Sequence, residues 1–326
     1  MKQIVLEAPG KFAEREAVAP VADDGHALVR MERVGVCGSD FHAFAGDHPI
    51  YTYPRVLGHE LACIVVETPA NARGIAPGSR CAIEPYLTCG SCRACLQGRR
   101  NCCERLRLLG IHVDGGMQEF LSVPLELLHP SARLSLDQLA LVETLGIGAH
   151  AVDRSGLRDG ETVLVVGAGP IGISVAQFAS AAGASVHIVE KSEWRRALVA
   201  RMGYSSSLSA EDRRADVVFD ATGSAAAMSA SLAYVATGGR LVFVGLTREP
   251  VCIDDALFHR KELSLLASRN SFGLFPRIIR LMEEGRIDTS HWVTDRLHLS
   301  DVVSQFGSLA GRVTLMKAMV DVNESA

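Results

Sequence analysis

The first 130 residues contain short segments in which apolar and polar residues alternate, or in which apolar residues run for the length of a strand. Glycine and proline separate these segments and interrupt regular structure. The pattern predicts strands at residues 1–8, 26–36, 60–68, 79–85 and 117–124. This part of the chain is therefore expected to be rich in β-structure.

The pattern changes at Ser135, which is followed three positions later by Gln138. This is the spacing of a capping box, and it predicts that a helix begins there and covers residues 136–156. Strands and helices then alternate, with strands at 162–169, 185–190, 216–223, 240–246 and 262–268 and helices at 170–183, 192–203 and 225–239. Such alternation is typical of a parallel sheet that helices cover on both faces, an α/β fold.

The last part of the chain has elements of other lengths. Helices are predicted at residues 275–286 and 300–311, and strands at 292–299 and 312–320. We expect this part to return to the first domain. The predicted domains are residues 1–146 together with 269–326, and residues 147–268, which fits roughly 150 residues per domain.

Composition excludes several classes of protein. Apolar residues make up 48% of the chain, too many for a disordered protein. The 33 Lys and Arg residues against 37 Asp and Glu residues leave a charge of −4, so no basic surface for nucleic acid is expected. No apolar run approaches the ~18 residues that span a membrane, and the first residues lack a secretory pattern. We expect a cytoplasmic protein with no nucleic-acid or membrane partner.

A glycine motif, GxGxxG, occupies residues 167–172, directly after one predicted strand and directly before a predicted helix. In this context it predicts a dinucleotide site, because the glycines allow a tight turn, backbone approach to the pyrophosphate and close packing of helix and strand. The alternative is a glycine turn that serves only packing. The candidate cofactor contacts of the motif are Gly167, Gly169, Pro170, Ile171 and Gly172.

Glu190 ends the next predicted strand, eighteen positions after the motif. A carboxylate there accepts hydrogen bonds from ribose hydroxyls and repels a 2′-phosphate, so NAD is favoured over NADP. Lys191 and Arg195 lie nearby and weaken this preference, and Arg195 is itself a candidate cofactor contact. The alternative is a solvated acidic residue at a strand end.

Five of the nine cysteines fall within fifteen residues. Cys89, Cys92, Cys95 and Cys103 have the spacing CxxCxxCxxxxxxxC, and four thiolates in so short a loop can hold a tetrahedral zinc ion that has no open position. Such a site is structural. Cys102 is expected to be a free thiol. The alternative is a set of reduced thiols without metal, which would be exposed to oxidation.

A second set of residues is dispersed along the chain. Cys37 begins the segment CGSDFH, His59 and Glu60 end the segment GHE, and Glu143 lies in the helix predicted at 136–156. Taken singly, each residue has an ordinary structural explanation as a core, turn or helix-face residue. Together with a dinucleotide fold they form a recognisable pattern.

These motifs resemble those of the zinc-dependent medium-chain alcohol dehydrogenases, in the branch that acts on polyols and sugar acids. The segments CGSD, GHE, GGMQEF, GAGPIG, FDATG and VFVGL and the four cysteines follow the order of that family over nearly the whole chain. Residues 53–60, 101–116 and 258–270 are most similar to hexonate dehydrogenases of the L-galactonate 5-dehydrogenase type. The resemblance implies a GroES-like catalytic domain at 1–146 with 269–326, a Rossmann NAD-binding domain at 147–268, NAD, and two zinc ions per chain.

The resemblance also implies roles for single residues. Cys37, His59 and Glu143 match the ligands of the catalytic zinc, and Glu60 matches a carboxylate that binds it directly or through water. Asp40 matches the acid that orients the zinc-bound histidine. Further roles are a hydroxyl that takes the substrate proton (Ser39), the outer end of the proton relay (His42), and a cation near the pyrophosphate (Arg312). The chain departs from the family at Thr144, where the branch has proline.

Other contacts follow from the same resemblance. Cofactor contacts are implied at Thr222, Gly245, Ser268, Arg269 and Asn270, and substrate contacts at His112 and Asn270. The expected activity is NAD-dependent oxidation of a secondary hydroxyl on a sugar acid or polyol, such as L-galactonate or L-gulonate. The alternatives are a dehydrogenase of other polyols, sugars or amino alcohols, and a non-catalytic sensor that binds NAD and zinc. A homo-oligomer, dimer or tetramer, is expected.

Overall fold

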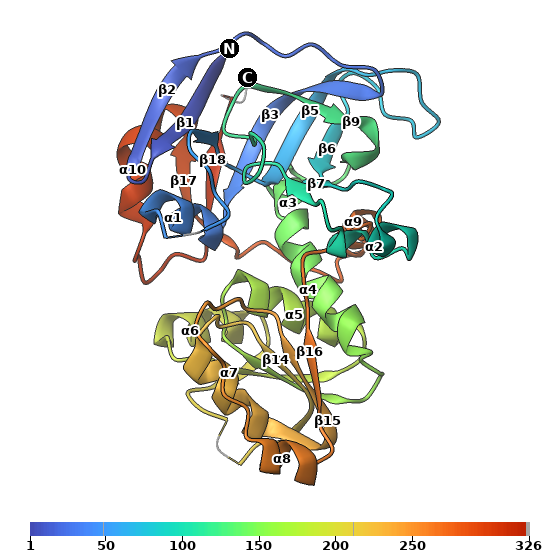
Figure 1. The fold of residues 1–326 in the computed structure, drawn as a ribbon, viewed down its shortest axis with the longest axis vertical. Helices are drawn as coiled ribbons and strands as arrows, with labels where there is room; N and C mark the ends of the chain where they lie inside the picture. The colour runs from blue at the N-terminus through green and yellow to red at the C-terminus, as the bar shows by residue number, and fades with distance from the viewer. Residues whose placement is uncertain (48, 211, 324–326) are drawn as a thin grey trace. The chain divides into compact units, whose positions relative to one another are not determined.

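The computed structural model describes residues 1–47, 49–210 and 212–323. The chain forms two compact units, drawn in Figure 1. Unit 1 consists of residues 1–143, 275–283 and 292–326, and unit 2 of residues 144–274 and 284–291. None of the helices in the described ranges is long and apolar enough to cross a membrane.

Unit 1 is built mostly on antiparallel strands, and its one parallel pair among the described residues is β17 with β18. Its main sheet has the order β10 (Leu128–Pro130), β6 (Arg80–Ile83), β5 (Glu60–Glu67), β3 (His26–Val36), β18 (Lys317–Asp321) and β17 (Val293–His298), and β9 (Phe120–Pro124) also pairs with β3. A smaller sheet joins β2 (Lys11–Glu16), β1 (Lys2–Ala8) and β4 (Arg55–Val56), and β7 (Tyr86–Leu87) pairs with β8 (Arg107–Leu108). In Figure 1 the red strand β18, near the end of the chain, lies beside the blue strand β3.

Short helices complete unit 1. They are α1 (Gly38–Ala45), α2 (Arg93–Leu96), α3 (Leu136–Ala140), α9 (Phe275–Glu283) and α10 (Val302–Leu309). Helix α4 (Val142–Ser155) begins in unit 1 and continues in unit 2. As predicted, Ser135 caps α3: its hydroxyl accepts from the Gln138 N–H at 3.2 Å, and the Gln138 side chain accepts from the Ser135 N–H at 2.9 Å.

Unit 2 contains the predicted parallel sheet. Its strands run in the order β13 (Ser205–Ser207), β12 (Ser185–Val189), β11 (Thr162–Val166), β14 (Ala215–Asp220), β15 (Val235–Phe243) and β16 (Ser264–Ala267), and every neighbouring pair is parallel. This is the strand order of a doubly wound dinucleotide-binding fold. The connecting helices are α5 (Pro170–Ala181), α6 (Glu193–Arg201), α7 (Ala225–Ser231) and α8 (Asp255–Arg260).

Three predicted elements differ most from the structure, and others differ in their end residues. The helix at 136–156 is two helices, α3 and α4, with Leu141 between them. The helix at 225–239 ends at Ser231, and β15 begins at Val235 because the following residues pair with β14. The predicted strand 312–320 begins only at Lys317. In the last two cases, pairing with a strand distant in sequence decides the boundary.

Candidate zinc and cofactor sites

Cys37, His59 and Glu60 lie together in unit 1. Cys37 follows β3 and precedes α1, whereas His59 and Glu60 stand at the start of β5. Strands β3 and β5 are antiparallel neighbours with Gly35 opposite Glu60, so the end of one meets the start of the other. One ligand atom from each of the three side chains lies within 4.8 Å of the others. Thiolate, imidazole and carboxylate are the ligand types of a catalytic zinc, so these residues fit the metal.

Asp40 completes the surroundings of His59. Its carboxylate is fully buried, and one oxygen accepts from the Cys37 N–H at 2.9 Å. The other oxygen lies 3.8 Å from Nδ1 of His59. Burial by itself would lower the pKa of His59, but Asp40 and Cys37 beside it raise that pKa well above its ordinary value. Asp40 is thus placed to orient the imidazole.

Glu143 lies outside that tight group but close to it. It stands in the first turn of α4 and is buried. The Tyr86 hydroxyl donates a hydrogen bond of 2.5 Å to its Oε1. Burial raises the pKa of Glu143, and the charge of His59 opposes that rise. The sequence did not indicate Tyr86 as a partner of this residue.

Lys317 is a second residue that sequence reasoning missed. Its ammonium nitrogen lies 2.6 and 2.8 Å from the two carboxylate oxygens of Glu60, and 3.3 Å from the carbonyl oxygen of Val36. The side chains of Lys317 and Glu60 are only 3% and 1% exposed. Burial would lower the pKa of Lys317, but the charges of Glu60 and Cys37 raise it above its ordinary value, so the side chain stays an ammonium.

Helix α1 carries both residues of the expected proton relay. Ser39 is partly exposed and His42 is exposed, and Nδ1 of His42 lies 2.9 Å from Oδ1 of Asp47. Tyr51, which is buried, lies near Ser39 and Asp40. Burial raises the pKa of Tyr51, so its hydroxyl remains protonated. Tyr51 is a further polar group at this site that the sequence did not reveal.

The four cysteines of the loop 89–103 come together as predicted. The Cys89 sulfur lies 3.4 Å from that of Cys103 and 3.9 Å from that of Cys95, and the Cys92 sulfur lies 3.9 Å from that of Cys103. A tetrahedral zinc ion with bonds of ~2.3 Å places its sulfur ligands roughly 3.8 Å apart. The N–H groups of Ser91 and Cys92 lower the pKa of Cys89 to about 5, which favours the thiolate. The loop therefore fits a four-cysteine zinc site.

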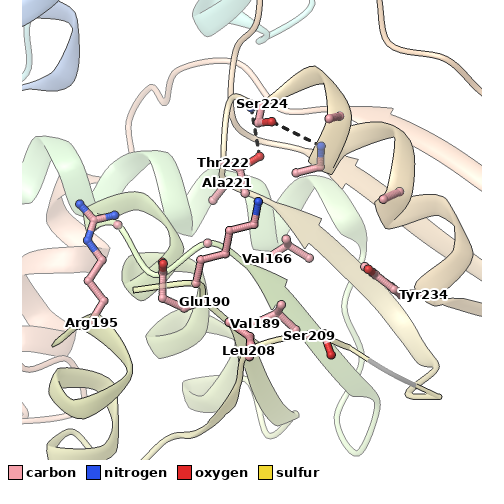
Figure 2. Close-up of a pocket in the computed structure, with 16 residues that line it drawn as sticks. Val166, Val189, Glu190, Arg195, Leu208, Ser209, Ala221, Thr222, Ser224 and Tyr234 are labelled. Atoms are coloured by element: carbon pink, nitrogen blue, oxygen red, sulfur yellow. Dashed lines mark hydrogen bonds between the residues drawn. The ribbon is translucent and has the colours of Figure 1, made fainter. Parts of the chain in front are cut away.

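Unit 2 has a pocket of about 530 Å³ at the ends of β11, β12 and β14. Its lining includes Gly167, Gly169, Glu190, Arg195 and Thr222, five of the residues expected to contact cofactor. In the view of Figure 2, Glu190 and Arg195 lie on one side of the pocket and Tyr234 on the other. The volume is in the range of small-molecule and cofactor sites.

The glycine motif has the geometry that a dinucleotide turn requires. Gly167 has a φ of +97°, which favours glycine. A Cβ on Gly172 would lie 1.8 Å from the Gly167 carbonyl oxygen, so only glycine lets the helix α5 pack this closely. A Cβ on Gly169 would meet only the Arg195 guanidinium, at 3.8 Å, which leaves the backbone open to a ligand. These geometries fit the three roles predicted for the glycines.

Glu190 is buried, and its carboxylate accepts hydrogen bonds from two loops. One of its oxygens accepts from the Ala168 N–H, and the other accepts from the Ser192 N–H, both at 2.7 Å. Each carboxylate oxygen can accept a further hydrogen bond, so contact with a ribose remains available. Glu190 therefore also supports the glycine motif, a role that the sequence did not indicate.

The remaining candidates lie outside the pocket lining. They are Pro170, Ile171 and Gly172 in the first turn of α5, Gly245 after β15, and Ser268, Arg269 and Asn270 after β16. A Cβ on Gly245 would lie 2.4 Å from the Gly223 nitrogen, so its glycine serves close packing beside Thr222. Asn270 has a φ of +50°, in the left-handed region.

Two candidates in unit 1 lie on loops. His112 is exposed, and its Nδ1 accepts from the Leu108 N–H at 3.1 Å, so the proton of the neutral ring is on Nε2. The loop that carries it packs against the segment before His59, because the Gly116 N–H donates to the Gly58 carbonyl at 3.1 Å. Arg312 donates to Asp295 on β17 at 2.8 Å.

Comparison with known proteins places the chain in a family. The alcohol dehydrogenase GroES-like domain family matches residues 23–133, and the zinc-binding dehydrogenase family matches residues 170–284. The L-galactonate-5-dehydrogenase of Escherichia coli is 38% identical over 310 residues, 91% of each chain. The 2-dehydro-3-deoxy-L-galactonate 5-dehydrogenase of Pseudoalteromonas atlantica is 32% identical over 326 residues, 95% of each chain.

A solved structure gives the same result. The zinc-binding dehydrogenase of Sinorhizobium meliloti, bound to NADP, superposes with a TM-score of 0.92 at 30% identity, covering 98% of this chain and 99% of that one. The chain belongs to the zinc-type medium-chain alcohol dehydrogenase family. It is a dehydrogenase of alcohols or polyols that uses zinc and a nicotinamide dinucleotide, which confirms the expected family, fold class and cofactors.

Proposed function

We propose that the protein oxidises a secondary hydroxyl group of a sugar acid, with NAD as hydride acceptor. Six-carbon aldonates such as L-galactonate or L-gulonate are the proposed substrates, and C5 is the proposed position. The observation that carries the proposal is the group of Cys37, His59 and Glu60, in which the last two are buried, in a chain 38% identical to a protein named L-galactonate-5-dehydrogenase. Other polyols, sugars and amino alcohols are the alternative substrates.

The proposal assigns the two expected domains their roles. Residues 1–146 with 269–326 form the catalytic domain, and residues 147–268 form the NAD-binding domain. Cys37, His59 and Glu143 hold the catalytic zinc, with Glu60 beside it, and Cys89, Cys92, Cys95 and Cys103 hold the structural zinc. The protein acts as a cytoplasmic homo-oligomer, a dimer or tetramer.

The chemistry follows from these groups. When bound, zinc supplies a Lewis acid that lowers the pKa of a hydroxyl group, and NAD supplies the hydride acceptor. Asp40, 3.8 Å from Nδ1 of His59, orients the ring beside Cys37. Ser39, which lies near Tyr51, takes the substrate proton. His42, exposed on the same helix, passes it to solvent.

Polar residues favour a hydroxylated substrate. The neutral ring of His112 presents an N–H donor at Nε2, and Asn270 and Arg269 offer an amide and a cation for hydroxyl or carboxylate groups. A site that hydrogen-bonds the hydroxyl groups of its substrate rejects apolar analogues strongly, because its polar groups would be left unpaired. Ethanol is therefore expected to be a poor substrate.

Steady-state kinetics test the proposal. The rate of NADH formation is measured with L-galactonate, L-gulonate, a panel of polyols, L-threonine and primary alcohols. The expected result is the highest kcat/KM for an aldonate. If primary alcohols were better substrates than every aldonate and polyol, the proposal would have to be abandoned. A sensor without catalysis would bind NAD but form no NADH with any compound, and Ser39→Ala gives the background rate for that comparison.

A further inference from the structure

The two carboxylates at the proposed catalytic site are held by different partners. Glu143 receives one hydrogen bond, from Tyr86 to Oε1. Glu60 has both oxygens within 2.8 Å of the Lys317 ammonium. A neutral phenol leaves a carboxylate free to bind a cation, whereas an ammonium already supplies one. The two glutamates are therefore not equivalent toward a metal.

The position of Glu60 is fixed on a second side by β3. A Cβ on Gly35 would lie 2.2 Å from Oε2 of Glu60, so the carboxylate lies directly against the strand where a side chain is absent. Lys317 also donates to the Val36 carbonyl, one residue before Cys37. With three contacts the ammonium uses all three of its protons. Lys317 thus fastens Glu60 to the end of β3.

Glu60 nevertheless stays within reach of a metal. Its carboxylate is within 4.8 Å of the Cys37 and His59 ligand atoms. One carboxylate therefore faces two cations, the buried ammonium and the zinc ion that this site fits. Because Lys317 and Glu60 are both buried, removal of the ammonium would leave a buried charge with the metal as its nearest partner.

We propose that Lys317 is a positioning residue that holds Glu60 beside the metal but off it, and so keeps a coordination position open for the substrate oxygen. This rests on the catalytic zinc site proposed above. It requires no change in oxidation state and no bond other than the ion pair seen here. Without Lys317, Glu60 would occupy the open position.

The test uses the full-length protein with cobalt in place of zinc, because the visible spectrum of Co²⁺ reports its ligands without any substrate. The spectrum of His59→Ala gives the contribution of the cysteine loop, which is subtracted. Lys317→Met is expected to change the spectrum of the remaining site. It is also expected to slow the loss of that metal to a chelator by about tenfold, the scale of effects from neighbours of metal ligands. The double variant Lys317→Met/Glu60→Gln is expected to restore the parent spectrum and rate.

Two further variants make the result decisive. Glu60→Gln alone is expected to leave the cobalt spectrum unchanged; a large change would show that Glu60 is already a ligand and would overturn the proposal. Lys261→Met removes a partly buried lysine of unit 2 that donates only to the Ala233 and Val235 carbonyls, and it is the control for general loss of stability. A Lys317→Met spectrum equal to the parent would also overturn the proposal.

The outcomes separate this inference from the proposed function. If Lys317→Met does not fold, the double variant still tests the proposal, because it leaves neither charge buried without its partner. A changed cobalt spectrum in the double variant would show that Glu60 is a ligand in the parent. If His59→Ala bound as much metal as the parent, the proposed catalytic site itself would be refuted. If the cobalt spectra of the variants change as expected but the protein oxidises no aldonate, only the proposed substrate class is refuted.

Discussion

The Tyr86 hydroxyl and the Glu143 carboxylate form a buried hydrogen bond of 2.5 Å between β7 and the first turn of α4. The chain has Thr144 after this glutamate, where the resemblance to the polyol branch implies a proline, so the backbone there lacks one restraint. Tyr86 supplies a restraint from the side chain instead. The orientation of Glu143 therefore depends on a residue far from it in sequence.

Tyr86→Phe is expected to weaken metal binding at the candidate catalytic site by about tenfold, because Glu143 loses the donor that fixes its carboxylate. Competition with a chromogenic chelator measures the effect. Tyr53→Phe is the matched control, since its hydroxyl donates to the Ala43 carbonyl at 2.6 Å. Equal affinities in the parent and Tyr86→Phe would show that Glu143 is held in some other way or is not a ligand.

Loss of a ligand should have different effects at the two zinc sites. Cys37→Ala or His59→Ala is expected to abolish turnover and to leave the melting temperature close to that of the parent, because the other core contacts remain. Cys92→Ala is expected to lower the melting temperature, because a closed zinc site contributes to folding of its own loop. Metal analysis and thermal unfolding of each variant check this. Fewer than two zinc ions per chain in the parent would contradict it, and so would full activity after chelation.

NAD is expected to be preferred over NADP because the Glu190 carboxylate would repel a 2′-phosphate. Glu190→Ser should narrow the ratio of the two kcat/KM values by about tenfold, which corresponds to roughly 1.4 kcal/mol of lost repulsion. Both cofactors should also bind more weakly, since the Ala168 and Ser192 N–H groups lose their acceptor. Glu190→Gln is the control, because it removes the negative charge but keeps the size of the side chain. A parent enzyme that uses NADP at least as well as NAD would refute the preference.

The stability of unit 2 should fall at acidic pH, because Glu161 forms an ion pair with Arg240. Arg240 donates to both of its oxygens, at 2.9 and 2.7 Å, and these hydrogen bonds lower the pKa of Glu161. A lowered pKa in the folded state means that this stabilisation is complete above the unfolded pKa of about 4.3 and is lost as the pH falls through the folded value.

Arg240→Met should therefore cost about 1–2 kcal/mol at pH 7 and less near pH 3. Urea unfolding at both pH values measures the difference, with Arg201→Met on the exposed part of α6 as control. A cost that is the same at both pH values would mean that the pairing with Glu161 does not contribute.

Local signals were sufficient for much of the fold. The strand predicted at 26–36 has the bounds of β3, the capping box at Ser135 forms, and the GxGxxG motif has the expected turn. In each case the decisive interactions are close in sequence: alternation within a strand, a side chain three residues away, or a glycine within its own turn. The four cysteines of the loop are equally local.

Residues that depend on distant partners could not be predicted in the same way. Lys317 is 257 positions from Glu60, and its strand begins five residues later than the alternation suggested. Tyr86 is 57 positions from Glu143. One signal was present: Lys317 interrupts the apolar segment LMKAMV, and a lysine on a strand next to the core requires a buried partner. Which partner it finds is set only by the pairing of β18 with β3.

The two metal sites also differ in how much of the chain must be synthesised before each can form. The cysteine loop has all four sulfur atoms between residues 89 and 103, so it can capture an ion while later residues are still being added. The other site, as proposed, needs residues 37, 59 and 143, and Lys317 joins them only after β18, which follows all three in the chain, has paired with β3. A cell that runs short of zinc would fill the loop first. It would accumulate folded enzyme that is inactive and that regains activity when the ion is added, without refolding.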